Sequence, residues 1–222
     1  MIDAAQGSVE ILSVFVLISA AFIINGRDLF ALFSLYRLQS FFIFVMAMVL
    51  FTRTGSYTTL SLAAITLVSK VLVIPMFLEM MQRKMKIKRD SEFHYLSPTS
   101  AIFVSMVMIM ISYISLSGVL RELALSNTFF LATVAGVSLT LMGMLFIFSR
   151  RQAITNVIGY LTMENGVLLI SLFLTELPLI IEALIVLDLF MLVLLATLLA
   201  FGIDSADGEE VSPFEKLFGG VK

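Results

Sequence analysis

Seven long apolar stretches constrain the fold of this chain more than any other feature. They cover residues 9–25, 29–51, 57–80, 98–119, 127–149, 152–174 and 178–203. Most are long enough to cross the ~30 Å hydrocarbon layer of a bilayer as one helix of about 20 residues. Hydrophobic residues make up 60% of the 222 positions and charged residues only 14%, which does not suit a soluble domain of this size.

Helices are the expected form of these stretches. Lipid offers no hydrogen-bond partner to an open strand edge, and the stretches are too long for the strands of a membrane barrel. The sequence therefore predicts an all-α, polytopic integral membrane protein with seven transmembrane helices. Residues 1–203 would form a single transmembrane domain, and residues 204–222 a short acidic tail on the cytoplasmic side.

The distribution of lysine and arginine predicts the orientation of the chain, because cytoplasmic loops carry an excess of these residues. With the N-terminus outside and the C-terminus inside, ten of the fourteen lie on the inner side: Arg27, Arg83, Lys84, Lys86, Lys88, Arg89, Arg150, Arg151, Lys216 and Lys222. The outer side would then receive only Arg53 and Arg121.

Two parts of the chain resemble each other and predict an internal duplication. Residues 9–80 and 127–203 would form two three-helix units, joined by a linker helix over 98–119. Aligning the segment from Asn25 with that from Arg150 pairs Gln39 with Glu164. A second alignment pairs Lys70 with Asp188. Since the units are offset by an even number of helices, they would form a parallel repeat, related by an axis along the membrane normal.

Five ionisable side chains lie within the predicted spans: Arg37, Lys70, Glu164, Glu182 and Asp188. Each costs about 2.5–3.5 kcal/mol at the centre of a membrane helix, so we expect them to face protein, water or one another. They are candidates for a proton or ion pathway, because buried carboxyl and amine groups can exchange protons. Three polar neighbours could support this pathway: Gln39, Asn165 and Tyr36.

The alternative is structural: the same charges could form locked ion pairs, with Lys70 on Asp188 and Arg37 on Glu164. Pro75 adds a further expectation, because proline cannot donate a hydrogen bond to the carbonyl of Val71. A loosened turn beside Lys70 would follow.

The sequence offers little for catalysis. It contains no cysteine and one histidine, His94, which excludes Cys-based zinc and iron–sulfur sites and leaves almost no ligands for haem. It also contains no phosphate-binding loop and no nucleophile–base set. We therefore predict no active site, metal or cofactor within this chain.

Four short motifs carry a resemblance to a known family: "GYLTMENG" from Gly159, "EALIVLD" from Glu182, "YRLQS" from Tyr36 and "SKVLVIP" from Ser69. With them the chain resembles the hydrogenase-4 component E family over nearly its whole length. These proteins are membrane subunits of energy-converting [NiFe]-hydrogenase and formate hydrogenlyase complexes. The second half is also similar to the K component of respiratory complex I and to the C component of multisubunit cation/proton antiporters, whose mid-helix carboxylate matches Glu164.

The resemblance implies a function in the cytoplasmic membrane of a prokaryotic cell. The chain would carry part of a buried charge chain that couples electron transfer and hydrogen evolution to proton or sodium translocation. Expected partners are membrane lipid, antiporter-like membrane subunits, a membrane subunit similar to the H component of complex I, and the hydrogenase peripheral arm, not nucleic acid. The nickel–iron centre and iron–sulfur clusters would reside in those partners. An antiporter subunit and a structural scaffold remain the alternatives.

Overall fold

The computed structural model describes residues 2–85, 98–122, 127–150 and 153–173, together with positions 183, 186–191, 193, 194 and 197. These residues are almost entirely helical and include no strand, which confirms the all-α prediction for them. The elements are α1 (Ile2–Asn25), α2 (Leu29–Thr54), α3 (Tyr57–Ile65), the π-helix η1 (Thr66–Val73), α4 (Ile74–Met85), α5 (Pro98–Glu122), α6 (Asn127–Ser149) and α7 (Ala153–Ser171).

Four helical stretches in the described part of the chain are long and apolar enough to cross a membrane. They are Gln6–Asn25, Leu29–Thr54, Tyr57–Arg83 and Thr128–Ser149, and a shorter apolar stretch runs over Ile102–Gly118. The third combines α3, η1 and α4 into one rod. Most of the last predicted span, 178–203, lies outside the described residues, as does the tail 204–222.

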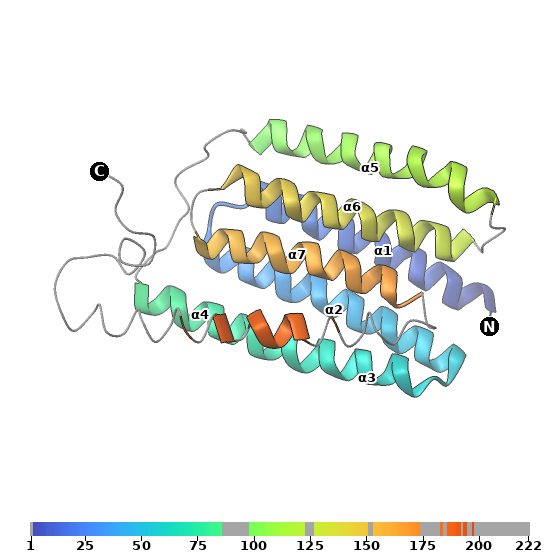
Figure 1. Ribbon diagram of the computed structural model, residues 1–222, viewed down its shortest axis with the longest axis horizontal. Coiled ribbons are helices and arrows are strands. Elements are labelled where there is room, and N and C mark those ends of the chain that lie inside the picture. The colour runs from blue at the N-terminus through green and yellow to red at the C-terminus, as the bar shows by residue number, and fades with distance from the viewer. Residues whose placement is uncertain are drawn as a thin grey trace.

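The helices lie side by side and alternate in direction (Figure 1). α6 packs against α1, and α7 packs against α2, so two helices of one predicted unit lie beside the aligned helices of the other. The α3–η1–α4 rod covers the outer side of α2, and α5 covers α6 at the opposite edge of the bundle (Figure 1). The buried apolar side chains between these helices form one continuous cluster.

Local sequence explains where α2 begins and ends. The carboxylate of Asp28 caps the start by accepting a hydrogen bond from the backbone N–H of Ala31 at 3.3 Å. At the other end Gly55 adopts φ 61°, a left-handed conformation that favours glycine, and its N–H bonds to the Phe51 carbonyl. The chain then turns directly into α3.

The third long helix is irregular at the place where the sequence predicts it. Pro75 has no N–H, and the eight residues Thr66–Val73 before it form a π-helix. The Ile74 N–H bonds to the carbonyl of Ser69, five residues back, instead of four. Lys70 lies within this widened segment, so the expected loosening beside the buried lysine is present.

Glycines set the unusually close approach of α6 and α7. A Cβ atom on Gly143 would lie 2.7 Å from the Gly159 carbonyl oxygen, and one on Gly166 would lie 2.5 Å from the Gly136 carbonyl oxygen. Each helix carries its two glycines seven residues apart, so both crossing points fall on the same face. Only residues without a side chain permit this backbone contact, which fixes α7 in depth and rotation.

Candidate functional site

Three of the predicted ionisable residues meet inside the helix bundle. The Nζ atom of Lys70 lies 2.9 Å from Oε1 of Glu164 and 3.1 Å from Oδ1 of Asp188. The Lys70 and Glu164 side chains are 0% exposed, and that of Asp188 is 6% exposed. One amine from η1 therefore joins two carboxyl groups, one from α7 and one from the helical residues 186–191.

The contacts of Lys70 in this carboxyl–amine–carboxyl triad are ion pairs. Neither contact of Lys70 meets hydrogen-bond geometry within the described residues, although both distances are those of ion pairs. A directed hydrogen bond runs from the Ser69 hydroxyl, which donates to Oδ2 of Asp188 at 2.9 Å. Asp188 is thus anchored twice on η1, whereas Glu164 contacts η1 through Lys70.

The "GYLTMENG" motif explains how α7 places its carboxylate. Gly159 and Gly166 press against the α6 backbone, which leaves Glu164 and Asn165 directed away from α6. Asn165 is 0% exposed, and its Nδ2 donates to Oε1 of Gln39 and to Oγ of Ser40, both at 3.1 Å. The motif therefore combines two packing positions with two polar positions that reach α2 and η1.

A neutral polar cluster adjoins the charged triad on the α2 side. It consists of Tyr36, Gln39, Ser40 and Asn165, all of them 0% exposed. Gln39 also donates to the Val16 carbonyl of α1 at 3.5 Å. The supporting polar positions predicted from the sequence are thus buried next to Glu164. Ser40 was not among those predictions, although its place next to Gln39 and one turn after Tyr36 was the signal for it.

Arg37 does not pair with Glu164, and that predicted pairing is wrong. Its Nη2 instead lies 2.5 Å from Oε1 of Glu79 in α4, with side chains 42% and 22% exposed. The reason is helical geometry: Arg37 and Gln39 are two residues apart and so point about 200° apart around α2. Gln39 faces α7, which turns Arg37 outward to α4.

Glu182, the fifth predicted pathway residue, lies outside the described residues. Among the described residues of this part of the chain, Asp188 is the carboxylate that lies next to Lys70, at 3.1 Å.

Positions that the predicted duplication aligns are neighbours in space. Lys70 contacts Asp188, its aligned counterpart, and Asn165 contacts Ser40, its own. Arg150 donates through Nη2 to the carbonyls on either side of its counterpart Asn25, those of residues 24 and 26. The aligned helices are thus in register at three levels along the bundle. This arrangement is consistent with the duplication, which stays a prediction.

Across the described ranges, no group of three or more His, Cys, Asp or Glu side chains is placed to hold a metal ion. The triad itself contributes two carboxyl groups, but the amine of Lys70 occupies the space between them. Comparison of the chain with protein-family models, with curated proteins and with solved structures finds no match.

Proposed function

We propose that this chain is a membrane-arm subunit of an energy-converting hydrogenase-type complex and carries one section of a buried charge chain. It would couple electron transfer and hydrogen evolution in partner subunits to the translocation of protons or sodium. The observation that carries the proposal is the triad of Glu164, Lys70 and Asp188, buried at 0–6% side-chain exposure. The sequence resemblance to the hydrogenase-4 component E family supplies the parent complex.

The triad is suited to relay because its charges do not balance. One amine faces two carboxyl groups, so a proton on either of them leaves a neutral pair and a protonated acid. At an effective dielectric of about 20, a unit charge moved to ~4 Å from another changes its energy by ~4 kcal/mol. A shift of Lys70 between the two carboxyl groups would change their proton affinities in opposite senses.

The surrounding structure favours such a shift over a locked pair. Lys70 is on a π-helix, a form found frequently at functional sites, and its contacts lack hydrogen-bond geometry among the described residues. Glu164 adjoins the neutral cluster defined above, which offers donors and acceptors on the α2 side. Charge movement could therefore continue from Asp188 through Lys70 to Glu164.

The proposed topology has seven transmembrane helices, with the N-terminus outside and the C-terminus inside. Four of the described helical stretches have the length and composition for it. The predicted inner side holds the turn between α1 and α2, the end of α4, the end of α6 and the start of α7, which share one end of the bundle (Figure 1). The basic residues in and beside these segments would then face the cytoplasm.

The test replaces Glu164 with glutamine in the assembled complex and measures ion translocation alongside hydrogen evolution. We expect E164Q to lose translocation, because the amide cannot take up a proton. The matched variant E164D keeps a carboxylate at the site and should retain part of the translocation. If E164Q translocates as well as the unmodified complex, the triad is a structural scaffold. Co-purification of this chain without a nickel–iron subunit, but with antiporter subunits, would favour the antiporter alternative.

A further inference from the structure

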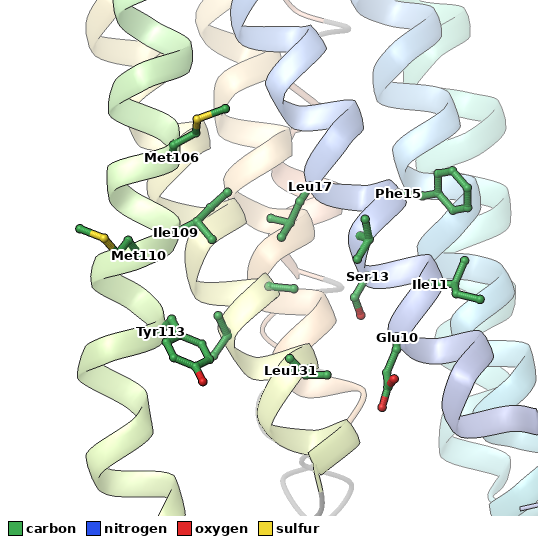
Figure 2. A pocket seen from close by; sticks show the side chains of 13 residues that line it. Glu10, Ile11, Ser13, Phe15, Leu17, Met106, Ile109, Met110, Tyr113 and Leu131 are labelled. Atoms are coloured by element: carbon green, nitrogen blue, oxygen red, sulfur yellow. The ribbon is translucent and has the colours of Figure 1, made fainter. Parts of the chain in front are cut away.

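An apolar groove lies on the far side of α1 from the charged triad. It has a volume of about 740 Å³, within the range of small-molecule and cofactor sites. α1 and α5 form its walls and α6 its floor, as Figure 2 shows. The lining includes the small side chains of Ser13 and Ala135 as well as larger ones such as Leu17 and Ile109. The groove is open along one side of the bundle.

The polar groups of the groove gather at one end. The carboxylate of Glu10 on α1 and the hydroxyl of Tyr113 on α5 lie near the same end, while Met106, Ile109 and Leu17 lie farther along the groove (Figure 2). The apolar stretch of α1 begins at Gln6, and Glu10 lies four residues after it, or about 6 Å along the helix. This end therefore lies near the level of lipid headgroups if α1 spans the membrane.

Glu10 has no cationic partner among the residues that the structure describes. Its neighbours around the groove are apolar apart from Ser13 and Tyr113, and the Ser13 hydroxyl already donates to the Val9 carbonyl at 2.8 Å. A carboxylate at the mouth of an apolar groove is best satisfied by a ligand that brings both a positive donor and an apolar body.

The groove suits a lipid chain better than another helix. A helix with its side chains is about 10–12 Å across. α1 and α5 already contact each other, and both contact α6, so a third helix cannot enter between them. A flexible acyl chain is narrow enough to lie along the groove over Met106, Ile109 and Ala135.

We propose that this groove binds one phospholipid with a primary ammonium headgroup, which is the chemistry of phosphatidylethanolamine. The ammonium would donate to Glu10, the Tyr113 hydroxyl would donate to an ester or phosphate oxygen, and one acyl chain would lie along α5 and α6. This site is separate from the triad and does not depend on ion translocation.

The test measures lipid retention by native mass spectrometry of the purified full-length chain. The protein is equilibrated with equal amounts of phosphatidylethanolamine, phosphatidylcholine and phosphatidylglycerol that share the same acyl chains. We expect about tenfold enrichment of the ethanolamine lipid, because one charge-assisted hydrogen bond distinguishes it. Choline has no N–H to donate, and phosphatidylglycerol is anionic and repelled by Glu10. Equal retention of the three lipids would overturn the proposal.

Two variants separate headgroup recognition from occupancy of the groove. E10Q is conservative and should abolish the preference among the three lipids while some lipid remains bound. Met110 is 55% exposed at the groove wall, so M110W narrows the groove without disturbing the buried core and should lower retention of all three. The control is F22A, at a 59% exposed position of α1 outside the groove, and its retention should be unchanged.

Two outcomes with these variants would contradict the proposal. Ethanolamine preference in E10Q equal to that of the unmodified chain would contradict the role of Glu10. Photo-crosslinking from position 110 to a protein helix, instead of to lipid, would show that another chain covers the groove.

Discussion

The Nζ atom of Lys70 lies 2.9 Å from Oε1 of Glu164, and the two residues come from opposite halves of the chain. Both side chains are fully buried, and Asp188 completes the group at 3.1 Å from the same amine. An ion pair in such surroundings has a high desolvation cost, so removal of one partner affects stability far more than it would at a surface. The stability of the isolated chain should therefore report on whether the triad is intact.

Replacement of Lys70 by methionine should destabilise the chain by about 3–5 kcal/mol, since two buried carboxyl groups lose their shared cation. Unfolding of the detergent-solubilised protein by heat or denaturant measures the change. The variant K70R keeps the positive charge and should lose less unfolding free energy than K70M. A K70M protein as stable as the unmodified chain would show that the triad does not form.

Loss of the Ser69 hydroxyl should weaken the anchoring of Asp188 on η1. We expect S69A to cost about 1 kcal/mol, the usual contribution of one hydrogen bond. The same change in a D188N background should cost less, because the two residues act through one contact. A double-mutant cycle measured by unfolding gives the coupling. S61A, at an exposed position of α3 where the hydroxyl bonds to its own helix, is the control. Additive effects of S69A and D188N would contradict the contact.

Alanine at Gly143 should separate α6 from α7. Its Cβ would lie 2.5 Å from the backbone nitrogen of Met163, next to Glu164, and backbone atoms cannot yield as a flexible side chain does. We expect a loss of about 1–3 kcal/mol in unfolding free energy, together with loss of ion translocation in the assembled complex. G118A on α5 is the matched control, because nothing lies within 4 Å of its Cβ. Equal stability of the two variants would show that the glycine contact is absent.

Exchange of the charges of Arg37 and Glu79 tests the pair on the outer side of α2. R37E places two carboxylates together and should destabilise the chain, as E79R should by placing two cations together. The double variant R37E/E79R restores opposite charges and should recover most of the loss. In a membrane, the coupling energy between Arg37 and Glu79 should exceed the ~0.2–1 kcal/mol that exposed ion pairs contribute in water. Purely additive losses in unfolding free energy would indicate that the two side chains do not meet.

Much of the architecture could be predicted because it depends on local or compositional properties. Long apolar stretches have few structural options in lipid, so helices over 29–51 and 127–149 follow from composition alone. The irregular turn beside Lys70 follows from the missing N–H of Pro75, and the buried state of Glu164 follows from its position deep in an apolar helix. These features need no knowledge of which helices are neighbours.

The partners of the buried charges could be predicted only in part: of the two predicted ion pairs, Lys70 with Asp188 is present and Arg37 with Glu164 is not. Sequence identifies residues that need a partner, but several choices satisfy the same need, and Arg37 pairs with Glu79 instead of the predicted Glu164. Helix rotation decides between such choices, and that rotation depends on contacts far apart in sequence. On α7 it is set by Gly143 and Gly159, which let α6 approach and turn Glu164 toward η1.

Composition and local pattern were enough to identify which residues are costly to bury, that the described chain is helical and where the third long helix loosens. They could not show that Lys70 contacts two carboxylates at once, or that Asn165 connects α7 to α2 beside the triad. The difference lies in the range of the interactions. Hydrophobicity and backbone hydrogen bonding act over a few residues of one helix, whereas ion pairs within 3.1 Å require three helical segments to be placed together by packing.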